Sequence, residues 1–435
     1  MRKVAFHTLG CKVNQYETEA MEELFENRDY KIVRDGEKAD IYIINTCTVT
    51  NFGDRKSRQF IRRAKKLNPN SIIAVVGCYS QISPDEVEKI EGVDVIIGTS
   101  QRERIVDLCE EAKSKEEKIN IVEDISKHRD FDNLNIVDIK EKTRANIKIQ
   151  DGCSQFCSYC IIPYARGPIR SRDLSNIIEE CIRLRDAGFK EIVLTGIHIA
   201  SYGKDIGDLG LIDVIEEISK IEGIERIRLS SIEPTLIDAD FMKRAVETGK
   251  LCDHFHLSLQ SGSDTVLKRM NRKYTTEEYK NIVNIIRKYM PDAGITTDVI
   301  VGFPGETDEE FEETYNFVKE IGFSKIHVFK YSPREGTVAS KMDNQIHGEI
   351  KQNRSERLIA LGEELSNNFN ESFLGKEFMV LYEEESKENP DFMEGYTTNY
   401  IRVKTKADKN TPGKIFNTKL IEIEKEYLLG KIEEF

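Results

Sequence analysis

The sequence contains no long apolar run. None of its hydrophobic stretches approaches the roughly 18 to 20 residues that a helix needs to cross a bilayer. The first residues, MRKVAFHTLGC, resemble a β-strand ending in a cysteine rather than a secretion signal. We therefore expect a cytoplasmic protein without a membrane partner. The chain has 435 residues, which is long for one domain, so two or three domains are expected.

The sequence also lacks the even set of cysteines that a disulfide framework requires. It has nine, and reduced thiols bound to metal are the better interpretation of an odd number. Three of them form the motif CSQFCSYC, in which Cys153, Cys157 and Cys160 have no fourth thiol nearby. A structural zinc ion usually has two separated pairs of ligands, and a bacterial ferredoxin motif needs a further cysteine. The spacing favours a four-iron cluster held by three thiolates, which leaves one iron open to a substrate or cofactor.

Basic residues do not outnumber acidic residues in this sequence. The net charge is -13, which is unfavourable for nucleic-acid binding because phosphate contacts depend on lysine and arginine. Two segments depart from this average: DRKSRQFIRRAKK, residues 54–66, has a basic helical pattern, and RGPIRSR, residues 166–172, directly follows the cysteine motif. For the first segment, a solvated helix face and an RNA-contacting surface are both open. The predicted RNA-contacting side chains are Arg55, Lys56, Arg58, Arg62, Arg63, Arg166, Arg170 and Arg172.

The first part of the chain alternates strands with amphipathic helices. Its strand-like segments are nearly continuous in apolar character, as in buried parallel sheets, and span residues 3–8, 40–46, 71–77 and 93–98. This rhythm predicts an α/β domain with an open parallel sheet over residues 1–112. Cys11, Cys47 and Cys78 each follow one of the first three strands, so a second metal site is predicted at one sheet edge. Cys109 and Cys181 lie in helical patterns and are expected in the core.

The remaining chain divides into three further parts. Residues 113–138 are highly charged and poorly patterned, which predicts a linker. Six βα units follow between residues 139 and 369 and predict a parallel sheet curled into a partial barrel. Its functional residues are expected at the carboxyl ends of the strands, where the cysteine motif lies. Residues 370–435 predict a small β-barrel, for which oligonucleotide binding and plain packing are both open. Its strand-like stretches are 376–385, 394–404, 413–424 and 426–434.

With these features placed, the chain resembles the methylthiotransferases of the radical S-adenosylmethionine superfamily over nearly its whole length. The resemblance rests on four blocks in family order: HTLGCKVNQYETE (7–19), INTCTVT (44–50), VVGCYSQ (75–81) and QDGCSQFCSYCIIPYARGPIRSR (150–172). It implies an α/β fold with an N-terminal open parallel-sheet domain, a central partial (βα)6 radical-SAM barrel and a C-terminal small β-barrel of the TRAM type.

The resemblance also implies the cofactors and their ligands. Cys153, Cys157 and Cys160 would hold a [4Fe-4S] cluster that binds S-adenosyl-L-methionine. Cys11, Cys47 and Cys78 would hold an auxiliary [4Fe-4S] cluster. Cofactor contacts would fall on Tyr159, Gly196, Ser231, Glu233, Gln260 and Gly302. Loop packing for Tyr159 and strand packing for Gly302 are open alternatives.

The activity implied is methylthiolation by a radical mechanism that uses two S-adenosylmethionine molecules. LGCKVNQYETE and GYTTNYIRV, residues 395–403, resemble the branch acting on N6-threonylcarbamoyladenosine next to the tRNA anticodon. The alternatives are isopentenyladenosine in tRNA, an aspartate of a ribosomal protein, and a non-catalytic iron-sulfur RNA-binding sensor. The implied partners are the tRNA anticodon stem-loop, a low-potential electron donor of the flavodoxin or ferredoxin type, and a sulfur donor.

Overall fold

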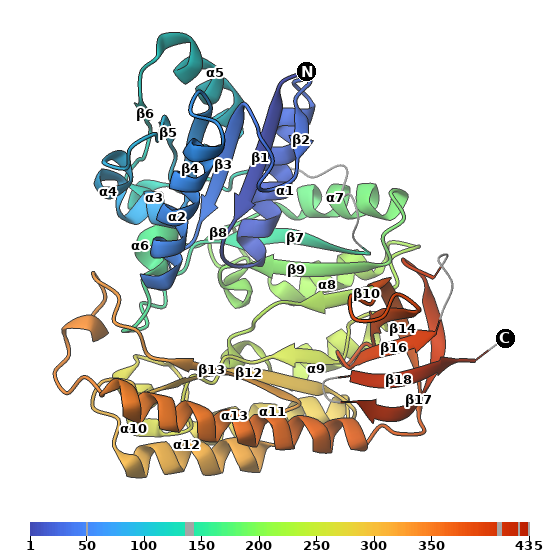
Figure 1. Ribbon diagram of the computed structural model, residues 1–435. Helices are drawn as coiled ribbons and strands as arrows, with labels where there is room; N and C mark the ends of the chain where they lie inside the picture. Colours follow the sequence, from blue (N-terminus) through green and yellow to red (C-terminus); the bar gives the residue numbers. More distant parts are fainter. Residues whose placement is uncertain (49–50, 135–142, 407–410, 425–426, 434–435) are drawn as a thin grey trace.

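The computed structural model describes residues 1–435 except 49–50, 135–142, 407–410, 425–426 and 434–435. An N-terminal α/β domain lies against one side of a curved central sheet, and a small β-barrel lies at one end of that sheet (Figure 1). The predicted fold class is confirmed. Within the described ranges, no helix is long and apolar enough to cross a membrane.

The N-terminal domain is built on a fully parallel sheet. Its strand order is β2-β1-β3-β4-β5-β6, and β3 and β4 are buried along their whole length, as their apolar runs predict. The strands are β1 (Lys3–Thr8), β2 (Lys31–Val33), β3 (Ile41–Thr46), β4 (Ile72–Gly77), β5 (Val95–Ile96) and β6 (Ile119–Asn120). The helices are α1 (Lys12–Glu26), α2 (Asn51–Leu67), α3 (Cys78–Ile82), α4 (Pro84–Glu88) and α5 (Ile105–Lys115).

The boundary of this domain differs from the prediction. Residues 113–138 were expected to form a linker, but α5 continues to Lys115 and β6 pairs with β5 as a sixth strand. Ile119 and Ile121 pack against the apolar core of the domain. The sequence does not reveal this strand because the two isoleucines alternate with charged and polar neighbours over only a few residues.

The central domain has a four-stranded sheet, order β10-β9-β7-β8, and a three-stranded sheet, order β11-β12-β13, which isolated bridges join into one curved layer with helices on its convex side. Its parallel strands are β7 (Arg144–Asp151), β9 (Glu191–Gly196), β10 (Arg226–Leu229), β11 (His254–His256), β12 (Gly294–Val301) and β13 (Lys325–Lys330), and β8 (Arg170–Ser171) is antiparallel to β7. The helices are α6 (Ile162–Arg166), α7 (Leu174–Asp186), α8 (Leu211–Ser219), α9 (Ala239–Glu247), α10 (Asp264–Arg269), α11 (Thr276–Tyr289), α12 (Asp308–Ile321) and α13 (Gly348–Glu371). Thr275 with Glu278 and Thr307 with Glu310 form capping boxes that begin α11 and α12.

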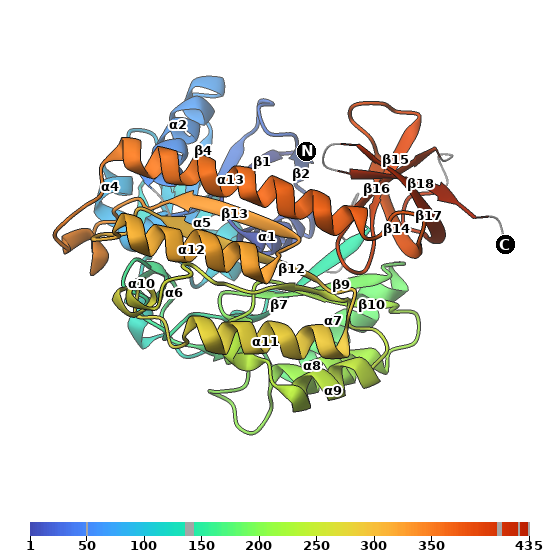
Figure 2. The same cartoon turned by 90° about the horizontal axis from the view of Figure 1, so that it is seen from below.

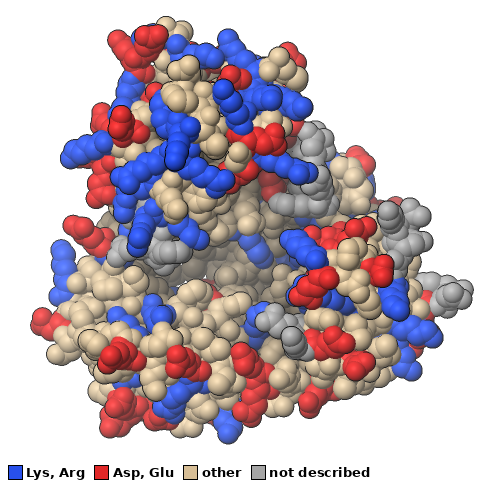
Figure 3. Space-filling model, viewed as in Figure 1, with Lys and Arg blue, Asp and Glu red and all other residues tan. Residues whose placement is uncertain are grey.

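The last central strand shows that the concave face of the sheet is open. Ile326 and Val328 on β13 pack against the apolar core beneath α13, whereas His327 and Phe329 point to the opposite face and are exposed. Figure 2 shows α13 running along β13 toward the small barrel. The concave face therefore lines a hollow, which is visible between the upper and lower parts of the molecule in Figure 3. We call this hollow the chamber.

The C-terminal domain is a closed five-stranded barrel. Its strands are β14 (Glu377–Glu385), β15 (Phe392–Tyr396), β16 (Arg402–Lys406), β17 (Ile415–Glu424) and β18 (Tyr427–Ile432), in the order β14-β15-β16-β18-β17. The stretch 394–404 was expected to form one strand, but a turn divides it. In this turn Thr397 Oγ1 accepts a hydrogen bond from the Ile401 amide at 2.9 Å, and Tyr400 has a φ of 72°. The TTN sequence favours a turn over a continuous strand.

Candidate cofactor and substrate chamber

The cysteine motif forms a loop at the carboxyl end of β7. The Cys153 amide donates to the Gly167 carbonyl at 3.0 Å, which closes the loop against the end of α6. Gly152 has a φ of 72°, and a Cβ atom there would lie 1.8 Å from the Pro168 carbonyl oxygen, so only glycine fits. Ser158 Oγ donates to the Arg269 carbonyl at 2.8 Å and ties the loop to α10. The three thiols are thereby held together where the sequence predicted them.

An arginine that sequence reasoning missed contacts this first trio. Arg272 donates from Nη1 to Cys157 Sγ at 3.3 Å and from Nη2 to Glu233 Oε2 at 2.7 Å. Burial raises the pKa of Cys153 to about 11 and of Cys160 to about 12, so as free thiols they are protonated at neutral pH. A guanidinium that donates to sulfur stabilises the thiolate form that iron requires. No motif marks Arg272, because its partners come from other loops.

Cys11, Cys47 and Cys78 also come together, as predicted, at the ends of β1, β3 and β4. Cys11 and Cys47 both act electrostatically on Cys78, whose pKa burial raises to about 11. Gly10, with a φ of 117°, permits the close approach, since a Cβ atom there would lie 2.9 Å from Cys47 Cβ. The side-chain Nδ2 of Asn14 donates to the Leu9 carbonyl at 2.7 Å and to the Thr46 carbonyl at 3.0 Å, which joins the ends of β1 and β3.

A buried ionic network lies between the second trio and the central domain. Arg166 donates to Cys78 Sγ at 3.3 Å, to Asn14 Oδ1 at 2.8 Å and to Glu17 Oε1 at 2.5 Å. Lys148 Nζ lies 2.9 Å from Glu17 and 2.6 Å from Asp151. Four buried cations, Arg102, Lys148, Arg166 and Arg170, face the buried carboxylates Glu17 and Asp151 and the nearly buried Asp132, which lies 3.4 Å from Arg102. The surplus of positive charge beside Cys78 suits a set of anionic thiolates.

This network corrects the RNA-contact prediction for the segment RGPIRSR. Arg166, Arg170 and Arg172 are at most 1% exposed. Arg170 pairs with Asp151 at 3.4 Å, and Arg172 forms a short ion pair with Glu180 on α7. A guanidinium this deeply buried cannot reach a phosphate. The prediction failed because only the fold brings each arginine to a buried carboxylate: Glu17 lies 149 positions from Arg166, and Glu180 faces Arg172 from the next helix.

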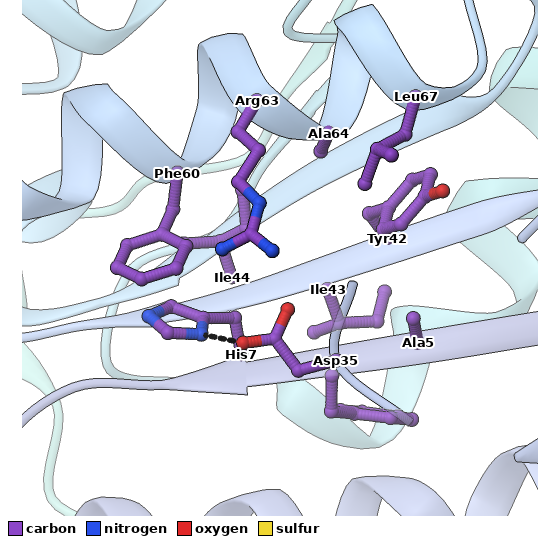
Figure 4. Close-up of a pocket in the computed structure, with 11 residues that line it drawn as sticks. Ala5, His7, Asp35, Tyr42, Ile43, Ile44, Phe60, Arg63, Ala64 and Leu67 are labelled. Carbon is purple, nitrogen blue, oxygen red and sulfur yellow. Dashed lines mark hydrogen bonds and ion pairs between the residues drawn. The ribbon is translucent and has the colours of Figure 1, made fainter. Parts of the chain in front are cut away.

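The basic helix α2 keeps its side chains at the surface. Arg55, Lys56, Arg62 and Arg63 are exposed, while Arg58 is half-buried and donates to the Tyr79 hydroxyl at 2.9 Å. Lysine and arginine side chains gather on this part of the N-terminal domain in Figure 3. Figure 4 shows the pocket beneath α2, where the His7 ring stacks on Phe60 with centroids 3.2 Å apart and its Nδ1 lies 2.7 Å from Asp35. The stack fixes α2 on the sheet.

The predicted cofactor contacts all lie at carboxyl ends of central strands. Gly196 ends β9, Ser231 and Glu233 follow β10, Gln260 follows β11, and Gly302 follows β12. Gln260 has a φ of 68°, and its backbone bridges to β12 through the Asp298 carbonyl and the Ile300 amide. Ser231 is exposed, Glu233 is mostly buried, and Tyr159 is partly buried against Met270 and Phe303. Their role in cofactor contact stays a prediction.

The donor chemistry of the two trios fits iron-sulfur clusters. A four-iron core is held by cysteine thiolates. Each trio consists only of cysteines, and each has an arginine that donates to sulfur. This donor chemistry is that of iron-sulfur ligation.

Comparison with known proteins gives consistent matches over both large domains. Residues 3–98 match the Uncharacterized protein family UPF0004, and residues 147–318 match the Radical SAM superfamily. The chain is 46% identical to the Threonylcarbamoyladenosine tRNA methylthiotransferase MtaB of Bacillus subtilis (strain 168), over 97% of this chain and 94% of the relative. It is 40% identical to the tRNA-2-methylthio-N(6)-dimethylallyladenosine synthase of the same organism, over 96% of this chain and 83% of the relative.

A solved structure supports the fold. The radical S-adenosylmethionine methyltransferase TsrM from Kitasatospora setae, with cobalamin and a [4Fe-4S] cluster bound, superposes with a TM-score of 0.56 at 15% identity. The match covers 78% of this chain and 77% of that one. At this identity the likeness concerns the architecture.

Proposed function

Because the chain belongs to the radical S-adenosylmethionine tRNA methylthiotransferases, we propose that it methylthiolates carbon 2 of N6-threonylcarbamoyladenosine next to the anticodon of tRNA. The observation that carries this proposal is the 46% identity, over almost the full length of both chains, to a relative named for that nucleoside. A second such relative, from Aquifex aeolicus (strain VF5), is 42% identical over 94% of this chain. The family uses [4Fe-4S] clusters and S-adenosylmethionine, and both trios of cysteines supply suitable ligands.

We assign one cluster to Cys153, Cys157 and Cys160 and a second to Cys11, Cys47 and Cys78. When bound, the first cluster supplies the low-potential electron that cleaves S-adenosylmethionine to a carbon radical, and the second presents sulfur to the substrate. A flavodoxin- or ferredoxin-type protein is proposed as the electron source, and a separate donor as the sulfur source. A second S-adenosylmethionine is proposed to supply the methyl group.

The chain's own residues would position these groups. Glu233 is held by Arg272 at 2.7 Å, and His198 Nε2 lies 3.7 Å from it. Burial opposes ionisation of Glu233, but His198 and Arg272 lower its pKa, so it stays charged at neutral pH and is available to a cationic ligand group. The buried Gln150 donates to the Gly152 carbonyl at 2.7 Å and accepts from the His198 amide at 2.7 Å. It thus links the loop before Cys153 to the end of β9.

The walls of the chamber are polar enough to receive a nucleoside. His256 Nδ1 lies 2.9 Å from Thr296 Oγ1, and its Nε2 lies 3.3 Å from Asp298. His327 and Phe329 on β13 extend this surface, and Phe329 is 52% exposed. An aromatic ring of this exposure offers a face on which an unstacked base can stack.

We expect α2 to contribute to tRNA binding by neutralising phosphate groups. The double variant Arg55→Gln/Arg62→Gln should reduce the slope of log K against log salt concentration by about 0.7 for each phosphate that the helix no longer neutralises. The matched control is Lys243→Gln/Lys319→Gln, which removes two exposed charges from the outer helices α9 and α12. Filter binding of a tRNA at several salt concentrations measures both. Equal slopes for the wild type and the α2 variant would remove α2 from the RNA interface.

The proposed activity is tested with defined tRNA substrates. The reconstituted protein, S-adenosylmethionine, a reductant and a sulfide source are incubated anaerobically with tRNA carrying N6-threonylcarbamoyladenosine or N6-isopentenyladenosine. Mass spectrometry of the nucleosides should show a methylthio group only on the first. The similarity to dimethylallyladenosine synthases makes the second substrate the alternative, and product on that tRNA alone would replace the proposal. If neither tRNA is modified and no 5′-deoxyadenosine forms, the protein is a non-catalytic sensor.

A further inference from the structure

Charged and aromatic side chains form a floor where the chamber meets the small barrel. The members of this chamber floor come from all three domains: Lys12, Arg144, Glu191, Arg228, His254 and Tyr400. Lys12 begins α1, four members lie at or near the amino ends of central strands, and Tyr400 lies in the turn before β16. α1 packs against β7 and β9, whose first residues are Arg144 and Glu191, and Lys12 lies within electrostatic range of Tyr400, Arg228 and His254. The floor is thus one connected group.

Tyr400 is held at the centre of this floor in a strained conformation. Its ring stacks between His254 and Tyr396, with centroid distances of 4.5 and 4.9 Å. The guanidinium groups of Arg228 and Arg144 lie 4.7 and 5.5 Å from the ring centroid. A φ of 72° is unfavourable for tyrosine, yet the ring is only half-buried. Strain of this kind at a partly open position is typical of ligand-binding sites.

The charges of the floor do not balance at Lys12. Arg144 pairs with Glu383 at 2.6 Å, and Arg228 pairs with Glu191 at 2.6 Å. Lys12 makes no ion pair with any residue that the structure describes, and its side chain is exposed. It also begins a helix without an acidic residue in the first turn, where the helix dipole disfavours a cation. The floor therefore offers one positive charge without a partner.

We propose that the chamber floor binds the carboxylate of the threonylcarbamoyl group, with the Lys12 ammonium as its direct partner and the Tyr400 hydroxyl as a second donor. This inference rests on the proposed function, because it names the substrate group that the same chamber recognises. A threonylcarbamoyl substituent ends in a carboxylate, whereas an isopentenyl group is neutral and offers nothing to an ammonium. The floor thus selects between the two nucleosides by charge.

The test compares two anticodon stem-loop RNAs that differ only at this group. One carries N6-threonylcarbamoyladenosine and the other its methyl ester, which removes the negative charge. Wild-type holoenzyme should bind the acid about tenfold more tightly than the ester, as fluorescence anisotropy would show. Lys12→Met should abolish this preference by weakening only the acid, and Lys12→Arg should restore most of it. Lys319→Met on α12, a matched exposed lysine, should leave both affinities unchanged.

Each outcome decides the inference. If Lys12→Met keeps the full preference, or weakens acid and ester equally as the removal of a phosphate-binding charge would, the inference is overturned. Iron content is measured for each variant because Lys12 follows Cys11. If Lys12→Met loses iron, the binding comparison is made with Tyr400→Phe instead. An unchanged preference of that variant for the acid over the ester overturns the inference. A wild type that modifies the acid RNA without preferring it over the ester contradicts this inference alone, whereas a wild type that modifies no threonylcarbamoyladenosine contradicts the proposed function.

Discussion

Replacing Glu17 with glutamine is expected to lower the free energy of unfolding by about 3–5 kcal/mol. Glu17 is fully buried and pairs with Arg166 at 2.5 Å, Lys148 at 2.9 Å and Arg102 at 3.3 Å. Glutamine has the same shape but no charge, so Arg102, Lys148 and Arg166 lose their shared counter-ion and keep only Asp151 and the nearly buried Asp132. An uncompensated buried charge is among the most destabilising changes a side chain can make.

The substitution should also weaken the contact between two domains, because the network spans their boundary. Glu17 and Arg102 belong to the N-terminal domain, and Lys148 and Arg166 belong to the central domain. Urea unfolding followed by circular dichroism measures the effect at matched iron content. Glu363→Gln on the exposed face of α13 is the control and should change stability by less than about 0.5 kcal/mol. If the two variants are equally stable, the network does not hold the domains together.

The pH dependence of stability follows from the same pairing. Burial alone would raise the pKa of Glu17, but the fields of Arg102, Arg166 and Lys148 lower it from 4.5 to about 2. Because the folded-state pKa is lower than the unfolded one, the stabilisation is complete above pH 4.5 and is lost as the pH falls toward 2. As the pH falls from 4.5 toward 2, the free energy of unfolding of Glu17→Gln should therefore decrease less than that of the wild type.

The sequence allowed the elements and both cysteine sets to be predicted, because these features are local. A run such as IIAVVG favours a buried strand, and a cysteine at the end of such a strand is expected at the sheet edge. The arginines of RGPIRSR were not predictable in this way. Whether Arg166 contacts a phosphate or Glu17 depends on how two domains meet, and the two residues are 149 positions apart.

The same limit explains why Arg272 and the chamber floor are not evident from the sequence. Arg272 contacts Cys157 and Glu233 only because three loops converge at the carboxyl ends of β7, β10 and α10. Lys12 lies within a family block, but a lysine beside a cysteine has no assigned role until its surroundings are known. The strand break at Tyr400 was not predicted because the alternation of EGYTTNYIRVK outweighed the turn signal of TTN.

Single substitutions in the two cysteine sets are expected to have complementary effects. Cys47→Ala should remove about four of about eight iron atoms and leave the formation of 5′-deoxyadenosine intact. Cys157→Ala should remove a similar amount of iron and abolish 5′-deoxyadenosine. The two sets lie at different strand ends in different domains, so each can be emptied without the other. Iron assays, visible absorption and product analysis by chromatography measure these outcomes.

The matched control is a cysteine that belongs to neither set. Cys181 on α7 is fully buried in the apolar core of the central domain, as its helical pattern predicted. Cys181→Ala should retain all the iron and the radical activity while losing some stability, because it removes a packed sulfur atom. Unchanged iron in Cys47→Ala would disprove the auxiliary site. Loss of 5′-deoxyadenosine in that variant, at half the iron content, would instead mean that the two sets depend on each other through the Arg166 network.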